Sequence, residues 1–523
     1  MTQGLPDDRR FGRGLFSLGL AAWVWAGWTL IPFDASDLSY VLALEGGVWA
    51  VQEFVHPLFV PVLAMLEALL PAAGAKGSIL LALAVLNLAA AGGALVLLFL
   101  LAERLSSRSA AAAAAVLGFA WAAAGFWVAC LRPTPYSLAA LCLALACRAI
   151  LAEGPRARRM AQAGLWAGLA CGLHLAALSF VVPAAVASSS GRGRLFVRFL
   201  ACMGAALLGC YAVFFLYHRL DPRIVLGLGG RDLLAGVEQV PTTSFWSNPQ
   251  PLTLGRDYLD TLRVQARFFL ALLAAAALLK AMAGELRESM ARLRKNGALA
   301  LAAALFAAFS AFYALNNTRN GFVFASLLAL PVVLAELVPV RRSHLAGFAL
   351  AALALAGSGA REVLGHESSA GRDPVYREAL FLSRTLGASD AVLVPGCPIP
   401  ELERLSGIRL IPAAPSGRGS HEGPHACPDR PVRPMEPGRV ADLLAAGRRV
   451  LYAPAPPGGA RDLDYVGDLK KRQAYAPFHR SAAGQERCLA GIERVLSRFH
   501  SREVRSPQGR VYRELLPVID QRK

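Results

Sequence analysis

The chain has 523 residues, 55% of them hydrophobic, and its mean hydropathy is +0.44. A soluble protein of this length does not need so many long apolar runs, so the composition predicts an integral membrane protein. The net charge of +18 does not indicate nucleic-acid binding, because the Lys and Arg residues are scattered among loops between apolar runs, as a multi-span protein requires.

The first apolar stretch, residues 11–32, is too long for a signal-peptide core and lacks a small-residue cleavage site, so we expect a retained span. About 20 apolar residues cross a bilayer as a helix, and the Leu- and Ala-rich runs show no strand-like alternation. Further spans are expected at 77–102, 109–131, from Tyr136 onward, 196–217, 265–282, 297–315 and 321–338.

Two segments need a decision. Residues 161–187 are apolar but contain Gly172 and His174, and basic segments flank them on both sides. Two short helices hinged at 171–174 would keep both basic segments on one side, so we expect a hairpin. Residues 345–357 are short for a crossing but are taken as the last span, which gives about eleven membrane segments.

The loop charges orient these spans. With the N-terminus inside, the N-terminal segment and the inside loops hold 17 Lys and Arg, whereas the longer outside segments hold 8. This asymmetry follows the positive-inside rule and places the chain after the last span outside. The inside loops are 103–109, 152–160, 188–198, 284–296 and 339–344, and the outside segments are 33–76, 131–133, 218–263 and 316–320.

The remaining chain predicts a soluble α/β domain, so we expect a helical membrane domain over 1–357 and an extracytoplasmic domain over 358–523. Short buried strands are expected at 391–395, 409–412 and 448–453, and helices at 378–386, 440–446 and 486–499. If this domain lies in an oxidising compartment, two of Cys397, Cys427 and Cys488 can form a disulfide.

Candidate chemistry lies in the first outside segment. Asp34 and Asp37 are three residues apart directly after the first span, so on a helical turn they would share one face. A carboxylate at the membrane surface can deprotonate an acceptor hydroxyl or hold a divalent metal. The alternative is a solvated helix start capped by Asp34 or Ser36.

Several loose motifs follow in a fixed order over roughly residues 10–340, and this order carries a resemblance. They are Asp34-x-x-Asp37, His56-Pro57-Leu58, Asn87, Arg132-Pro133-Thr134-Pro135-Tyr136, the glycine-rich 168–175 with His174, and 316–331 with Arg319 and Pro331. Together they resemble a bacterial multi-span family related to protein O-mannosyltransferases. The residues at Asp37, Leu58-Phe59 and Leu173 depart from those usual in that family.

The resemblance implies the GT-C membrane glycosyltransferase fold and transfer of a sugar from a polyprenyl-phosphate donor to an acceptor outside the membrane. The catalytic acid of that family's first loop corresponds to Asp34 or Asp37, and we favour Asp37 as the base, with Asp34 as its partner or a metal ligand. At outside span ends, Arg132 and Arg319 could bind the donor phosphate through a bidentate fork.

The resemblance also makes His56, Tyr136 and His174 candidates for donor or substrate binding. Each has a simpler explanation. His56 before Pro57 could start a re-entrant helix, and Tyr136 could be an interfacial aromatic. His174 could be a neutral side chain bonded to a backbone carbonyl freed by the break at Gly172. The two arginines could instead be headgroup anchors, which is the more common role of an arginine at the end of a span.

Two other functions stay open at this point: a transporter or flippase of lipid-linked intermediates, and a membrane scaffold whose tail binds partners. The Ala-, Arg- and Gly-rich composition is typical of a high-GC bacterium, so we expect the bacterial inner membrane, with the tail in the periplasm. The acceptor is not indicated by any motif.

Overall fold

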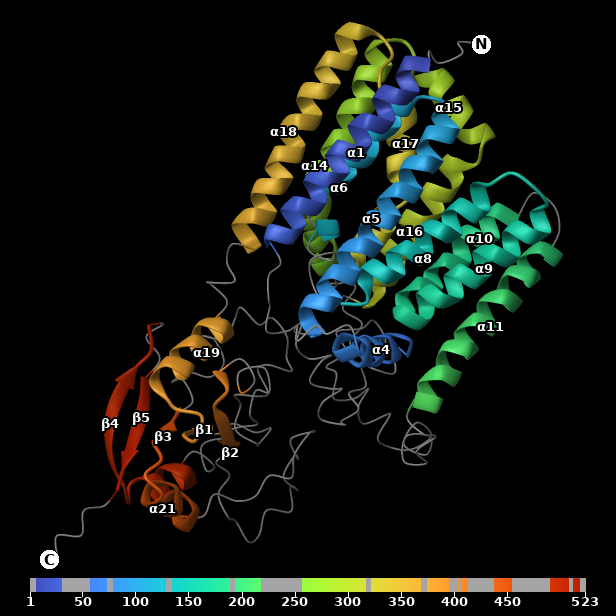
Figure 1. Ribbon diagram of the computed structural model, residues 1–523. Coiled ribbons are helices and arrows are strands. Elements are labelled where there is room, and N and C mark those ends of the chain that lie inside the picture. Colours follow the sequence, from blue (N-terminus) through green and yellow to red (C-terminus); the bar gives the residue numbers. More distant parts are fainter. Residues whose placement is uncertain are drawn as a thin grey trace, which may run out of the picture. The chain divides into compact units, whose positions relative to one another are not determined.

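The structure, a computed structural model, describes residues 6–30, 57–72, 79–123, 125–127, 134–188, 193–217, 256–316, 321–367, 374–394, 403, 406–412, 437–453, 490–507 and 511–517 (Figure 1). The chain divides into two compact units, a helical unit and a smaller α/β unit near the C-terminus.

The helical unit has the long apolar helices of a multi-pass membrane protein. Its elements are α1 (Pro6–Leu30), α4 (Phe59–Ala72), α5 (Ile79–Ser106), α6 (Ser109–Ala122), α8 (Tyr136–Leu151), α9 (Arg156–Leu173), η2 (Leu175–Phe180), α10 (Val181–Ser188), α11 (Gly193–Tyr217), α14 (Arg256–Met282), α15 (Leu286–Lys295), α16 (Ala298–Asn316), η3 (Gly321–Leu327), α17 (Leu330–Leu337) and α18 (Arg342–Glu367).

Among the described residues, three helices are long and apolar enough to cross a bilayer, and they lie within α5, α11 and α18. The consecutive helices α14 and α15 would add a fourth span if counted as one, but a bend of 119° separates them. The expected count of about eleven membrane segments is therefore not confirmed, although several shorter apolar helices, including α6, α8 and α16, accompany the long ones.

Two expected spans are divided. The span expected over 109–131 is wrong at its end, because α6 stops at Ala122 and Ala123 has non-helical dihedral angles. The span expected over 321–338 is wrong as one helix, because it consists of the 3-10 helix η3 and the separate helix α17. Pro331 lies in the first turn of α17, where its fixed φ and missing N–H favour a new helix start.

Two other segments have boundaries that differ from those expected. The inside loop expected at 284–296 contains α15, a short helix that buries Ser289 and Leu293 and exposes a basic face. The last span expected at 345–357 is the much longer helix α18, which ends at Glu367. By contrast, the expected break near 171–174 is confirmed, since α9 ends at Leu173 and His174 is extended.

The Ala-rich helix α6 packs against α1, α5, α14, α17 and α18 (Figure 1). Small side chains let neighbouring backbones come close. Gly12 of α1 and Gly359 of α18 lie against the α6 backbone, where an added Cβ would overlap main-chain atoms of Ser109 and Trp121. The Ala run therefore makes α6 a buried helix around which longer helices assemble.

Glycines also set the packing of α9 against α11. Gly164, Gly168 and Gly172 recur every fourth residue, so they share one face of α9. A Cβ at Gly164 or Gly168 would overlap the carbonyl oxygens of Phe199 or Met203 on α11. This small-residue stripe brings the two backbones into contact.

One end of the helical unit is held together by ion pairs. Arg13 of α1 forms two hydrogen bonds to the Glu103 carboxylate at 3.1 and 3.2 Å, and the Asp8 carboxylate accepts from the backbone N–H of Ser109. These residues belong to the N-terminal segment and the 103–109 loop, which the charge pattern places on one side. Their contacts agree with that grouping.

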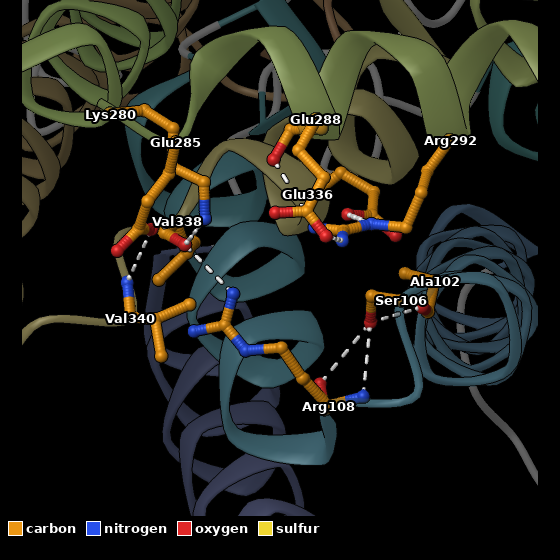
Figure 2. A network of polar contacts seen from close by, with 11 residues as sticks. Ala102, Ser106, Arg108, Lys280, Glu285, Glu288, Arg292, Glu336, Val338 and Val340 are labelled. Atoms are coloured by element: carbon orange, nitrogen blue, oxygen red, sulfur yellow. Dashed lines mark hydrogen bonds and ion pairs between the residues drawn. The ribbon is translucent and has the colours of Figure 1, made fainter. Parts of the chain in front are cut away.

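Figure 2 shows how three further segments join this end. The carbonyl of Val338, just after α17, accepts hydrogen bonds from Arg108 Nη1 at 2.8 Å and Lys280 Nζ at 3.0 Å. The buried Lys280 ammonium also pairs with Glu285 at 3.0 Å. Cations at a helix C-terminus satisfy unpaired carbonyls and complement the helix dipole.

The α/β unit is a five-stranded sheet in the order β2-β1-β3-β5-β4. Its strands are β1 (Ala391–Val394), β2 (Arg409–Pro412), β3 (Val450–Tyr452), β4 (His500–Arg505) and β5 (Val511–Leu516). Strand β1 is parallel to β2 and β3, whereas β5 is antiparallel to β3 and β4. The three expected strands are confirmed, and the antiparallel pair at the end was not predicted.

Helices cover both faces of the sheet. Helix α19 (Pro374–Thr385) packs on one face through Ala379 and Leu382, and α21 (Pro437–Ala445) packs on the other through Val440 and Leu444. Residues 490–496 form a further helix on the second face, within the expected helix 486–499. The α/β architecture expected for the tail is thus present.

Arg449, which precedes β3, ties this unit together. Its guanidinium donates to Glu514 at 2.8 Å and to the Thr385 carbonyl, and its backbone N–H donates to Asp390 at 2.8 Å. Arg502 donates to the other Glu514 oxygen at 2.6 Å. Hydrogen bonds from Arg449 and Arg502 lower the pKa of the buried Glu514 carboxyl below its ordinary value.

Candidate functional site

The motifs that are far apart in the sequence meet at one corner of the helical unit. Asn87, fully buried on α5, donates its side-chain N–H to the carbonyl of Thr134 at 2.9 Å. Thr134 lies two residues before Tyr136, the first residue of α8. This bond fixes the start of α8 against α5, and with it the position of the Tyr136 ring.

A second hydrogen bond connects the His-Pro-Leu motif to this corner. The backbone N–H of Leu58 donates to the carbonyl of Gly172 at 2.9 Å. The break at the end of α9 frees that carbonyl, and the start of α4 supplies its donor. A side chain at Gly172 would overlap Cys210 of α11 and touch Leu58, so this close approach requires glycine.

His174 occupies the break itself and is 5% exposed. Its Nδ1 accepts a hydrogen bond from the backbone N–H of Ala176 at 3.1 Å, so the side chain caps η2. The carbonyl of Gly172 accepts its hydrogen bond from Leu58, and Nδ1 of His174 accepts from an amide, so neither of these two groups pairs with the other. With Nδ1 accepting, the neutral imidazole carries its proton on Nε2.

The ring of His174 lies beside that of Tyr136, with the centroids 5.2 Å apart. Two of the proposed binding residues therefore come together, although one starts α8 and the other ends α9. Tyr136 is half-buried, so tertiary contacts help to fix its position.

Hydroxyl groups that the sequence reasoning missed lie near this pair. Tyr313, buried on α16, is within electrostatic reach of Tyr136 and of Tyr258 on α14. The Tyr258 hydroxyl is 2.6 Å from that of Ser310 and also interacts with Ser326 of η3. These aromatic residues are single and widely spaced in the sequence, so no local pattern identifies them.

The Tyr313 hydroxyl is buried and has no hydrogen-bond partner among the described residues. A buried polar group without a partner is costly, so native proteins rarely leave one. Tyr136, His174 and the hydroxyls of Tyr258 and Tyr313 thus form one corner of the helical unit, and it contains a buried hydroxyl without a partner among the described residues. We call it the hydroxyl corner.

Asp34, Asp37, His56, Arg132 and Arg319 lie outside the described residues, as do Cys397, Cys427 and Cys488. The described part of the chain contains no cluster of three His, Cys, Asp or Glu side chains that could hold a metal ion.

No protein-family model matches the chain, and no curated protein matches it significantly. Solved structures do match. The structure of ArnT from Cupriavidus metallidurans in the apo state has a TM-score of 0.56, covering 96% of this chain and 98% of ArnT at 14% identity. ArnT is a GT-C glycosyltransferase.

The chain has the GT-C fold. The fold implied by the motif order is therefore confirmed, over nearly the full length of both proteins. At 14% identity the GT-C likeness concerns architecture alone, so the donor, the acceptor and the catalytic residues have to be argued from this chain's own residues.

Proposed function

We propose that this chain is a membrane glycosyltransferase that moves a sugar from a polyprenyl-phosphate donor to an acceptor outside the cytoplasm, whether protein, lipid or cell-envelope glycan. The observation that carries the proposal is the GT-C fold over 96% of the chain. The contacts among Asn87, Thr134, Tyr136, Gly172 and His174 support it, because separate motifs build one corner.

In this proposal the hydroxyl corner binds the donor. A sugar presents hydroxyls, and a phosphate presents acceptor oxygens, so tyrosine and serine hydroxyls suit both. Arg132 is two residues before Thr134, and Arg319 lies between α16 and η3, which pack together beside the corner. A planar guanidinium at either place would hold the donor phosphate through paired hydrogen bonds.

Asp37 is the proposed base, with Asp34 its partner or a metal ligand, and His56 contributes to substrate binding. The reaction removes a proton from the acceptor hydroxyl, forms the bond from that oxygen to the anomeric carbon, and releases polyprenyl phosphate. An acidic side chain at the membrane surface is suited to take that proton.

The test uses membranes that contain the full chain, polyprenyl-phosphate sugars labelled in the sugar, and acceptors extracted from the host. Label should enter the acceptor fraction, and Asp37→Asn should reduce its rate by about 10²–10⁴-fold. Asp442→Asn, an exposed acid on α21, is the matched control and should leave the rate unchanged. Label that crosses the membrane but never enters an acceptor would instead indicate a transporter or flippase.

The placement in the membrane is also a proposal. The odd number of expected spans and the loop charges put the chain after α18 in the periplasm of a bacterial inner membrane. A phosphatase fused after Arg372 should be active, and a cytoplasmic reporter fused there should be silent. The opposite pattern would overturn the proposed sidedness.

A further inference from the structure

A cleft of about 460 Å³ lies where three elements of the helical unit meet: the end of α5, the turn between α8 and α9, and the turn after α15. Its polar lining is Arg104, Glu153, Arg159 and Asn296. All four belong to segments that the charge pattern assigns to the inside. We call it the basic cleft, and the proposed transferase chemistry does not use it.

Arg159 is held in a fixed place in the basic cleft. Its Nη1 donates to the carbonyls of Ile150, at 3.3 Å, and Ala152, both at the end of α8. Its Nε is buried without an acceptor among the described residues. An arginine anchored through one nitrogen keeps further donors for a ligand.

Arg104 is paired more loosely. Its guanidinium lies 2.6 Å from the Glu153 carboxylate, whose side chain is 91% exposed. Exposed ion pairs contribute little, so a ligand anion can replace Glu153 with small loss. Binding would then exchange one partner of Arg104 for another, with Glu153 moving into water.

The surroundings of the basic cleft are strongly cationic. Arg156 and Arg158 are exposed in the first turn of α9, and Arg294 and Lys295 are exposed in the last turn of α15. Helix α15 is amphipathic and turns by 119° from α14, as expected of a helix that lies along a membrane surface. The helix ends around the cleft would thus lie at the level of lipid headgroups.

We propose that the basic cleft binds the phosphate group of an anionic phospholipid in the adjacent leaflet, through Arg104 and Arg159. Clusters of basic side chains between spans at the cytoplasmic surface are suited to such headgroups, with about 1 kcal/mol for each cation near the surface. A free phosphate ion has the same chemistry, and the experiment separates the two.

The test titrates the detergent-purified full chain with phosphatidylglycerol, and separately with phosphatidylcholine, and counts bound lipids by native mass spectrometry. Phosphatidylglycerol should bind in preference. Arg159→Gln and Arg104→Gln should each weaken its binding about fivefold, the factor that corresponds to one lost surface cation. Arg158→Gln, exposed on the same turn but outside the cleft, is the matched control and should have a much smaller effect.

Glu153→Gln should change the affinity for phosphatidylglycerol in the opposite direction. Removing the competing carboxylate should tighten phosphatidylglycerol binding, and a gain cannot arise from misfolding. Equal losses in Arg158→Gln and Arg159→Gln, or no tightening in Glu153→Gln, would overturn the site. Displacement of the lipid by millimolar inorganic phosphate would overturn the lipid assignment in favour of a free anion.

Discussion

The rings of Tyr136 and His174 lie 5.2 Å apart, inclined at 54°, at the junction of α8 with the break after α9. This contact joins two motifs of the sequence. His174 also has a structural role, because its side chain caps η2. Any test of His174 in donor binding must therefore keep the cap while removing the ring.

His174→Asn meets that requirement. An Asn side chain accepts from a backbone N–H two residues on, so the cap of η2 should remain. If the imidazole contributes to donor binding, His174→Asn should raise the KM for the donor while its melting temperature stays near that of the wild type.

His174→Leu is the comparison variant, because it removes both ring and cap. Loss of a helix cap costs about 0.5–2 kcal/mol, so this variant should be less stable than His174→Asn in detergent. Normal donor saturation in His174→Asn would leave His174 as a cap only.

The glycine stripe on α9 predicts stability effects of opposite sign. In Gly168→Ala the new Cβ would overlap the Met203 carbonyl and Ala206 on α11, so we expect destabilisation of about 1–3 kcal/mol. In Gly204→Ala on α11 the Cβ meets nothing within 4 Å, so the better helix propensity should stabilise by about 0.5–1 kcal/mol. Unfolding in detergent, followed by tryptophan fluorescence, measures both. Two changes of equal sign would contradict the close packing.

Substituting Lys280 and substituting Glu285 should lower the free energy of unfolding by unequal amounts. Lys280 is fully buried, whereas the Glu285 side chain is 20% exposed. Among the described residues, Glu285→Leu leaves the buried ammonium with only the Val338 carbonyl as a side-chain partner, so we expect a loss of about 3–5 kcal/mol.

Lys280→Met should cost less, because Glu285 keeps some exposure to water and a hydrogen bond from the Val340 N–H at 3.3 Å. The double variant should lose less unfolding free energy than the two single variants lose in sum. A double-mutant cycle on unfolding free energies measures this difference. Strict additivity would show that the pair contributes nothing.

The lowered pKa of Glu514 predicts an acid-sensitive α/β unit. The carboxylate is favoured in the folded state, so its contribution is complete above its ordinary pKa of 4.5 and is lost as the pH falls through the lower folded value. Glu514→Gln should be less stable by about 1–3 kcal/mol at neutral pH and should lose less stability below pH 4.5. Thermal unfolding of the full chain between neutral and acid pH tests this. Parallel pH profiles for the two proteins would contradict the assignment.

The elements that could be predicted from the sequence are those with a local hydrophobic pattern. Apolar length located α5 and α11 nearly end to end, and short apolar runs located β1 and β2. Strand β4 was missed because five of its six residues are exposed and most are polar, so it has no hydrophobic run to detect. It forms because β5 offers a hydrogen-bonding edge.

The candidate site was predictable only in part for the same reason. The motif order pointed to Tyr136 and His174, and the structure brings their rings together. Tyr258 and Tyr313 belong to the same corner through the packing of α14 and α16, which no local pattern encodes. Long-range packing, rather than periodicity, decides which hydroxyls face one another.

The edges of the five-stranded sheet have a consequence for solubility. An open edge offers unpaired N–H and C=O groups on which strands of other molecules can add. Edge strand β4 presents Arg502, Glu503 and Arg505, all exposed, so an incoming strand would have to pass a row of charges. The opposite edge, β2, is four residues long and ends in Pro412, which cannot donate. Both borders of the sheet that the described residues form therefore resist strand addition, which lowers the tendency of this unit to assemble edge to edge.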